Sequence, residues 1–459
     1  MNKKIYKNPI FFCWSVWLFC FAWALTIVLI SDKRYPWSDE WNFVPYLTGV
    51  RAVTWAWLWE QHVDHRIPIV KVIYLILSRL FPVDFRPPIY FNVLLMSTLA
   101  AILIHAARKI RKQQNYADAF FPLFTTHMGL GFWSWGFSIQ FVFPTFLIGL
   151  MMIVWTIATT KANIIRGKYA CVCLSSLTLL LPLCGSNGLV LSLGCLFFLI
   201  WTLRQKFFLS AQPFFNRLIM GTSALFTLFL QVFYFSDLVK TDHGWGKLTL
   251  ASFLKTTAWV YTAPLGFVFT MSWLITLLSF FLFSWLWAKL IRELPYMQPN
   301  DRLYSCGMMF LWVSVAALGP IVGYGRGARV WTLGLAVHYS TLCLPLFLGT
   351  YLVAIRLQLT RFCFVSFVLS VVIYCLYMPI SFLYSFQIRQ RMKTVDMDMK
   401  RDITLDAFIS NQVSQLFFID TNEARNLIRE GMLALAQQSI KTNSTSLQKN
   451  RKFATALKS

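Results

Sequence analysis

Charged side chains are scarce in this chain, since Asp, Glu, Lys and Arg make up 13% of its 459 residues while 57% are hydrophobic. An average soluble domain carries about 25% charged residues. The shortage excludes a soluble globular enzyme, a disordered chain and a fibrous repeat. The abundant residues, among them 43 Phe and 19 Trp, fall in long apolar runs. This pattern predicts an all-α polytopic membrane protein.

Acidic residues are scarcer than basic residues. The chain has 18 Asp and Glu and 42 Lys and Arg, which gives a net charge of +24. A nucleic-acid-binding protein would gather its basic residues on one folded domain. Here they occur in short clusters between apolar runs, as at Arg108–Lys112. Such clusters mark cytoplasmic loops under the positive-inside rule. We therefore expect membrane lipids, and no nucleic acid, among the partners.

The sequence also lacks any CxxC pair, and its ten cysteines lie in or beside apolar runs. It offers neither zinc-finger spacing nor a disulfide framework. The N-terminal lysines precede the apolar run Pro9–Ile30, which is longer than a signal-peptide core and matches one membrane span of about 20 residues. We expect an uncleaved first helix with a cytoplasmic N-terminus.

The basic clusters make it possible to count crossings. Three apolar stretches lie between the N-terminal lysines and Arg108–Lys112, although two cytoplasmic ends require an even number of spans. The middle stretch, 67–83, carries Lys71 and Arg79, and a charge at a helix centre costs about 2.5–3.5 kcal/mol. We expect an interfacial amphipathic helix there. Residues 31–88 then form one large external loop.

Continued along the chain, the same alternation predicts about eleven spans in a membrane domain, 1–386, followed by an amphipathic external tail, 387–459. The run 119–160 is expected to be a hairpin of two spans that turns at 135–140, and the stretch 248–265 to lie at the interface or re-enter the membrane. The other expected spans are 9–30, 89–107, 169–184, 189–203, 218–236, 268–288, 304–323, 338–355 and 362–386.

The first external loop holds two adjacent carboxylates, Asp39 and Glu40, between Trp37 and Trp41. A carboxylate pair at a membrane surface suits a general base or a divalent-cation ligand. A solvated turn after Pro36 is the structural alternative. We expect Asp39 and Glu40 to be catalytic and name no certain cofactor, with a divalent cation left open.

About twenty residues later the same loop carries His62, Asp64, His65 and Arg66. The two histidines lack the HExxH spacing and have no cysteine nearby, so we expect no metal site. At positions i and i+3 they face one way if the segment is helical. We interpret the cluster as substrate-binding, and contact of Arg66 with lipid headgroups is the alternative.

Three further predicted turns bring polar residues to the external side, with Gln140, Asn187, and the pair Arg326 and Arg329. The arginines stand between small residues and suit a phosphate or pyrophosphate, because a guanidinium donates two parallel hydrogen bonds. Anchoring to lipid headgroups is the alternative. We expect all four residues to bind substrate, and His338 lies nearby.

In this order the motifs resemble the GT-C class of polytopic glycosyltransferases, which use lipid-linked sugars and carry an acidic motif in a large first external loop. More narrowly, they resemble bacterial serotype-converting O-antigen glucosyltransferases. The matching segments are Ser38–Trp41, Val63–Ile67, Trp135–Phe141 and Val337–Ser340. Two departures stand out, since His338 replaces an expected arginine and Asp64 an expected glutamate.

The resemblance implies that a sugar moves from a polyprenyl-phosphate donor to an envelope glycan or lipid acceptor, such as O-antigen or lipopolysaccharide. It also implies a multi-pass protein of the bacterial inner membrane with its site on the periplasmic face. Three other classes stay open. They are a lipid-linked saccharide flippase, which would place ionisable groups inside its spans, a membrane acyltransferase, and a non-catalytic scaffold.

Overall fold

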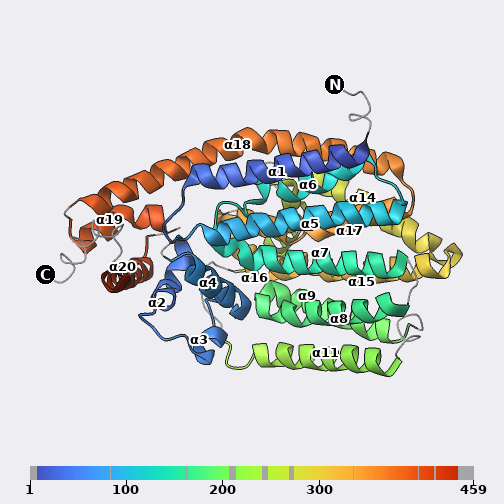
Figure 1. The fold of residues 1–459 in the computed structure, drawn as a ribbon, viewed down its shortest axis with the longest axis horizontal. Coiled ribbons are helices and arrows are strands. Elements are labelled where there is room, and N and C mark those ends of the chain that lie inside the picture. Colours follow the sequence, from blue (N-terminus) through green and yellow to red (C-terminus); the bar gives the residue numbers. More distant parts are fainter. Residues whose placement is uncertain are drawn as a thin grey trace.

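The computed structural model describes residues 8–82, 84–160, 164–205, 213–239, 247–267, 273–333, 335–401, 403–417 and 420–442. Among these residues every regular element is a helix, apart from one backbone bridge between His62 and His65. The long helices run side by side in one bundle (Figure 1). The predicted all-α class is confirmed.

Nine helical segments in the described ranges are long and apolar enough to cross a bilayer. A span of about 30 Å needs about 20 residues at 1.5 Å per residue. The helices that supply these segments are α1 (Pro9–Ser31), α5 (Pro87–Arg111), α7 (Ile139–Thr160), α9 (Ser186–Leu203), α11 (Pro213–Tyr234), α14 (Trp273–Glu293), α15 (Pro299–Ala316) continued by α16 (Leu318–Leu333), the 3-10 turn η9 (Val337–Thr341) continued by α17 (Leu344–Arg356), and α18 (Thr360–Lys400).

Two of the eleven predicted spans do not reach this length. The first, predicted at 169–184, lies in α8 (Ile164–Leu180) and the 3-10 turn η6 (Leu181–Cys184), whose apolar part is a shorter helix. The second is the first half of the predicted hairpin at 119–160. There the chain forms only α6 (Phe120–Thr126) and the 3-10 turns η4 (Met128–Leu130) and η5 (Gly136–Ser138).

Glycine explains why the first half of that hairpin does not continue as a helix. Gly131 follows η4 with φ of 69°, a left-handed conformation that ends helical turns. A Cβ at Gly131 would overlap the side chain of Val337, and one at Gly129 would lie 2.7 Å from the ring of Tyr377. The expectation of two long helices in 119–160 is therefore wrong, because this segment is packed as irregular backbone.

The remaining described elements are shorter helices, 3-10 turns and the tail helices. They are η2 (Ser38–Asn42), α2 (Val44–Leu47), α3 (Trp55–Trp59), α4 (Pro68–Leu80), η3 (Tyr116–Ala119), α12 (Leu250–Thr262), η7 (Ala263–Leu265), η8 (Leu294–Tyr296), α19 (Leu405–Leu416) and α20 (Asn422–Thr442).

The surface helix predicted at 67–83 is present as α4, whose 13 residues rise about 20 Å and cannot span the membrane. Lys71 is buried on this helix rather than turned to solvent. Its Nζ donates to the carbonyl oxygens of Trp57 at 2.5 Å and Glu60 at 2.9 Å. These two bonds replace water around a charge that would otherwise be costly to bury.

Residues 32–86 gather at one end of the bundle, which we call the loop end and which lies on the left in Figure 1. The opposite end holds the start of α1 and the basic last turn of α5. The two are linked through Cys13, whose Sγ lies 3.3 Å from the carbonyl oxygen of Asn115. The start of the first helix and the first basic cluster thus lie at the same end of the bundle. An even number of spans between two cytoplasmic ends requires this arrangement.

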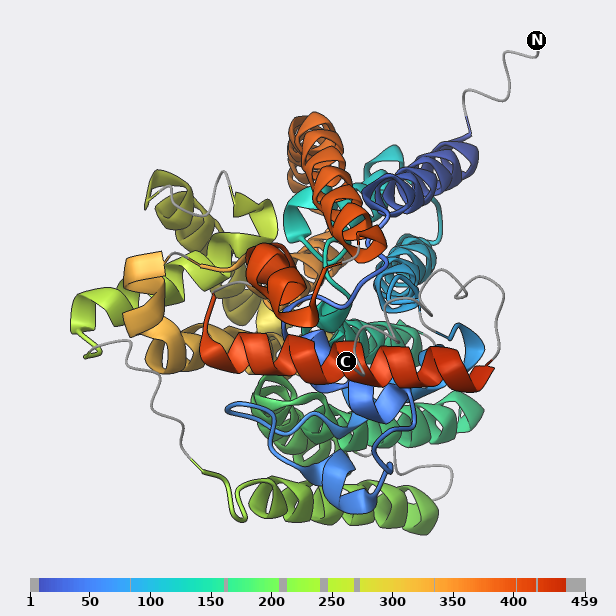
Figure 2. The same cartoon turned by 90° about the vertical axis from the view of Figure 1, so that its left-hand side faces the viewer.

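The tail returns to the loop end. α18 has 41 residues, about 60 Å, so its second half extends past the spans. α20 then lies across the loop end above the first loop (Figure 2). A Cβ on Gly431 of α20 would lie 2.5 Å from the ring of Trp41, and Arg51 pairs with Glu430 at 2.5 Å. The amphipathic tail helices therefore lie on the same side as residues 31–88.

The fold predicts the sidedness of three exposed positions. Single cysteines at Glu60→Cys in the first loop and Asn426→Cys in α20 should react with an impermeant maleimide from one side of the membrane. Lys112→Cys, after α5, should react from the other side. The background protein needs serine at the exposed Cys173 and Cys375. Labelling of Glu60→Cys and Lys112→Cys from the same side would contradict this topology.

Candidate functional site

The acidic motif is held in place by Glu40, which is 1% exposed. Its Oε1 accepts a hydrogen bond from the hydroxyl of Tyr74 at 2.7 Å, and its Oε2 accepts one from the backbone N–H of Trp37 at 2.9 Å. Burial raises the pKa of Glu40, while the nearby charge of Lys33 opposes the rise. Both oxygens are engaged inside the protein. The structure therefore gives Glu40 an anchoring geometry, and its catalytic role stays a prediction.

Lys33 completes this buried cluster. It is 5% exposed, and its Nζ donates to the carbonyl oxygen of Ser134 at 2.8 Å. Burial lowers the pKa of Lys33 to about 8, although Glu40 acts to raise it. Gly136 closes the cluster on the other side, because a Cβ there would lie 2.5 Å from Glu40 Oε1 and 2.8 Å from the Tyr74 hydroxyl. The turn at 134–136 is thus fitted against the acidic motif.

Asp39 has a different environment, because it is only half-buried. Burial raises its pKa to about 6, and the Ser38 hydroxyl and the charges of Arg329 and Arg326 counteract this rise. Ser38, which precedes it, has φ of 55°, a left-handed conformation uncommon for a residue with a side chain. A carboxylate whose pKa lies near neutrality is suited to accept a proton. Of the predicted pair, Asp39 is the more exposed residue.

The next predicted cluster is a tight turn and not a helix, so the condition under which the two histidines would share one helical face is not met. His62 and His65 exchange backbone hydrogen bonds of 2.7 and 3.0 Å, and Val63 between them has φ of 53°. His65 Nε2 lies 2.9 Å from Gln140 Oε1. Burial lowers the pKa of His65 to about 4, so this imidazole is neutral and donates to the amide oxygen.

His62 turns inward instead. Its ring centroid lies 5.1 Å from that of Phe137 and 5.9 Å from that of Phe43. Burial also holds the pKa of His62 well below its ordinary value. These ring contacts make His62 part of the packing beneath the turn. Its predicted substrate contact stays a prediction.

Arg66 is engaged by main-chain carbonyl groups. Its guanidinium donates to Trp59 O at 2.6 Å, to Tyr234 O at 3.1 Å and to Ser236 O. The last two acceptors lie at the C-terminal end of α11, where a cation is favoured by the helix dipole and by unsatisfied carbonyls. Arg66 thus fixes the turn to α11, and its predicted substrate contact stays a prediction.

Arg326 and Arg329 lie within α16, so the external turn predicted at 325–329 is wrong. Their spacing of three residues places both on the same side of the helix. Arg326 Nη2 pairs with Asp64 Oδ2 at 2.9 Å, with both side chains partly buried. His338 lies nearby, with its ring 4.6 Å from that of Phe141. The helix therefore presents two cations to residues of the first loop.

Two predicted residues mark the inner boundary of the site. Gln140 is 6% exposed in the first turn of α7. Asn187 is half-buried in the first turn of α9, behind Gly185. Gly185 has φ of 104°, and a Cβ there would lie 3.6 Å from His65 Cδ2. The starts of α7 and α9 therefore meet the turn that carries His65.

The described part of the chain contains no group of three or more His, Cys, Asp or Glu side chains that could hold a metal ion. Asp64, the second carboxylate facing α16, is already paired with Arg326. This donor set does not fit a divalent cation. We derive no chemical step through one.

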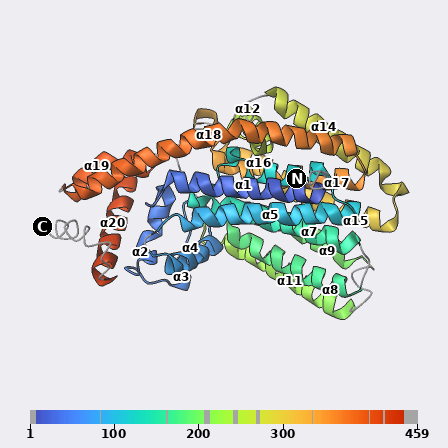
Figure 3. The same cartoon turned by 45° about the horizontal axis from the view of Figure 1, so that its top comes forward.

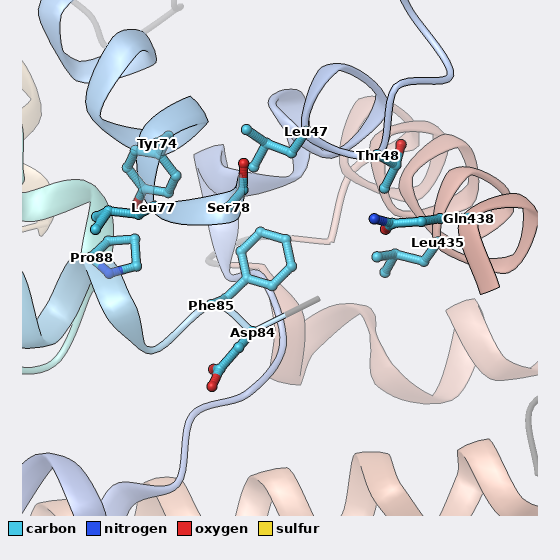
Figure 4. Close-up of a pocket in the computed structure, with 10 residues that line it drawn as sticks. All are labelled: Leu47, Thr48, Tyr74, Leu77, Ser78, Asp84, Phe85, Pro88, Leu435 and Gln438. Carbon is cyan, nitrogen blue, oxygen red and sulfur yellow. The ribbon is translucent and has the colours of Figure 1, made fainter. Parts of the chain in front are cut away.

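Sequence reasoning missed the residues that support the site. Lys33 and Tyr74 had no motif around them, and Glu423 in α20 acts electrostatically on Asp39 from about 380 residues away in the chain. A small cavity of about 20 Å³ lies between α4 and α20, lined in part by Tyr74, Leu435 and Gln438 (Figure 4). It has room for a water molecule and not for a sugar.

These environments predict opposite effects of neutralising the two carboxylates. Glu40→Gln leaves Lys33 without its counter-charge and removes one acceptor, so it should lower the free energy of unfolding by about 1–3 kcal/mol. Asp39→Asn removes a desolvated charge and should not destabilise the protein. Thermal unfolding in detergent at pH 7 measures both, with Glu60→Gln, at an exposed position of the same loop, as control. Equal stability of all three variants would contradict the anchoring role.

Asp39 also predicts a pH dependence of stability. Its pKa is 3.8 in an ordinary environment and about 6 here, so the folded state holds the proton more tightly than the unfolded state. The wild type should therefore lose stability as the pH rises from about 4 to about 6. Asp39→Asn should lack this component. An identical pH profile of the melting temperature in both proteins would argue against the raised pKa.

The site was compared with known proteins at three levels. A scan against protein-family models, a search of curated proteins and a search of solved structures each find no match for this chain. A functional assignment therefore depends on the chemistry of the residues gathered at the loop end.

Proposed function

We propose that this protein is a membrane glycosyltransferase that moves a sugar from a polyprenyl-phosphate donor to an envelope glycan or lipid acceptor. The observation that carries the proposal is the meeting of Asp39, a carboxylate with a raised pKa, with Arg326 and Arg329 at one end of a membrane bundle. Glycosyl transfer from a lipid phosphate needs a base for the acceptor and cations for the phosphate. This site supplies both.

In this proposal Asp39 is the general base. It accepts the proton of the acceptor hydroxyl as that oxygen attacks the anomeric carbon of the donor sugar. The bond between this carbon and the phosphate oxygen breaks, and polyprenyl phosphate leaves with the electron pair. Arg326 and Arg329 offset the negative charge that develops on the departing phosphate. Asp64 orients Arg326 before the donor phosphate takes its place.

The position of the site supports a donor anchored in the bilayer. α4 is too short to cross the membrane, and the starts of α7 and α9 border the site. A lipid phosphate lies at headgroup depth, which corresponds to the ends of spanning helices. The basic last turn of α5 lies at the opposite end. By the positive-inside rule, we propose that the loop end faces the periplasm of a bacterial inner membrane.

The resemblance to serotype-converting enzymes suggests O-antigen or lipopolysaccharide as the acceptor. A lipid-linked saccharide flippase is the alternative, since it would bind the same phosphate. Transport would require ionisable groups along a path through the bundle. The ionisable groups that contact each other around Asp39 gather instead at one end. This distribution favours chemistry at the membrane surface over passage through it.

Asp39→Asn should reduce transfer by roughly 10²- to 10⁴-fold, the usual contribution of a general base. In the wild type, kcat/KM should rise up to about pH 6 and then level off, because the base acts when unprotonated and burial raises the pKa of Asp39 to about 6. The residual activity of Asp39→Asn should not show this rise of kcat/KM with pH. The assay follows labelled sugar from polyprenyl phosphate into lipopolysaccharide by purified protein. Full activity of Asp39→Asn would refute the proposal.

Arg326→Lys keeps the charge but loses the two-pronged geometry of a guanidinium. It should raise the donor KM roughly tenfold while the variant stays folded. Arg425→Lys is the matched control, because Arg425 pairs with Asp420 on the exposed face of the tail. Transport of labelled carrier lipid across vesicles without a glycosidic product would favour the flippase instead.

A further inference from the structure

α16, the helix that carries both arginines of the site, packs along α12 (Figure 3). Gly319, Gly323 and Gly327 stand four residues apart on α16, so they lie on one face. A Cβ at Gly319 would lie 2.5 Å from the ring of Tyr261, and one at Gly327 would lie 2.6 Å from Leu248 Cδ1. One face of α16 thus has no room for a side chain.

The closest approach is at Gly323. A Cβ there would overlap Thr257 Oγ1 and lie 3.0 Å from the carbonyl oxygen of Phe253. Contact with that backbone oxygen requires the two helices to separate by a few tenths of an ångström, and relief of the Thr257 overlap without rotation of its side chain requires roughly 1 Å. Small residues at such spacing commonly allow membrane helices to approach closely.

A fourth glycine of α16 provides the contrast. Gly325 lies between Gly323 and Gly327, yet no atom comes within 4 Å of a Cβ built there. Gly325 therefore faces open space on the same helix. Replacement by alanine changes helix propensity equally at Gly323 and Gly325, so only the contact with α12 differs between the two positions.

The glycine face determines where the guanidinium groups lie. Arg326 is next to Gly327, and its pair with Asp64 at 2.9 Å joins α16 to the first loop. A displacement of α16 by 1 Å would stretch this pair beyond hydrogen-bonding distance unless the side chain readjusts. A misplacement of this size at a binding site can cost up to about 10²-fold in rate.

We infer that Gly323 and Gly327 are positioning residues. They set the distance between α16 and α12 and so place Arg326 and Arg329 where they bind the donor phosphate. The inference rests on the proposed function for its substrate and on the helix packing for its geometry. The two parts are tested by different measurements.

The geometric test uses Gly323→Leu, with Gly325→Leu as the matched control. Spin labels at Tyr324→Cys on α16 and Val63→Cys in the first loop, both exposed positions, report the distance between the two elements in a background without Cys173, Cys306 and Cys375. Gly323→Leu should lengthen or broaden the distance distribution, whereas Gly325→Leu should reproduce that of the parent. Identical distributions in both variants would overturn the inference, whatever the protein catalyses.

The functional test uses the milder Gly323→Ala. It should raise the donor KM roughly tenfold with a smaller change in kcat, because it displaces cations that hold the donor, whereas Gly325→Ala should match the wild type. Thr257 Oγ1 is buried and has no hydrogen-bond partner among the described residues, so Thr257→Ala costs little. The double variant Gly323→Ala/Thr257→Ala should recover much of the affinity for donor.

The outcomes separate the two proposals. Rescue by Thr257→Ala together with a normal Gly325→Ala supports the positioning role. An unchanged donor KM in Gly323→Ala overturns it. If Gly323→Leu shifts the spin-label distance but the wild-type protein transfers no sugar from polyprenyl phosphate, the packing role stands and the glycosyltransferase proposal fails.

Discussion

The buried carboxylate of Glu40 is the interaction on which the loop end depends. A charge that is 1% exposed costs several kcal/mol to desolvate unless it is paired and hydrogen-bonded. The Tyr74 hydroxyl, the Trp37 N–H and the charge of Lys33 meet these requirements. They come from α4 and from the segment just before the acidic motif, so satisfying one carboxylate fixes the backbone around Asp39. The neighbouring aspartate can then remain half-exposed.

The different environments of Glu40 and Asp39 have a physical cause. Successive side chains of the short turn η2 point in different directions, so Glu40 enters the core while Asp39 faces α16. Each carboxyl group then has a distinct electrostatic environment, with a lysine beside Glu40 and two arginines beside Asp39. A similar separation occurs in the cluster that follows, where His65 meets Gln140 and Arg66 clamps α11.

Backbone segments pack closely at three positions around the site. Gly136 fits against Glu40, Gly185 lies behind His65, and Gly431 of the tail lies against Trp41. At each of these positions a methyl group would lie within van der Waals distance of its neighbour, or closer. The site is assembled from five segments that are distant in sequence, and glycines allow these segments to approach one another. Interiors of this density transmit small displacements rather than absorb them.

The sequence alone determined the membrane architecture and the identity of the polar segments. Long apolar runs and basic clusters predict spanning helices and their alternation, because desolvation of charge is a local property of each run. The same reasoning identified the surface helix at 67–83, and it singled out Asp39, Asp64, His65, Gln140, Arg326 and Arg329 as residues of one membrane face.

Only the tertiary structure decided how deeply each of these residues is buried and which partners it contacts. Whether Glu40 or Asp39 is the anchored carboxylate depends on Tyr74, Lys33 and Gly136, which no local pattern connects to the acidic motif. The failure of 119–160 to form two long helices and the helical state of 325–329 have the same origin. Glycines read as turn signals in a sequence, but within a packed bundle they also permit close helix contact, and the neighbouring chain determines which of the two occurs.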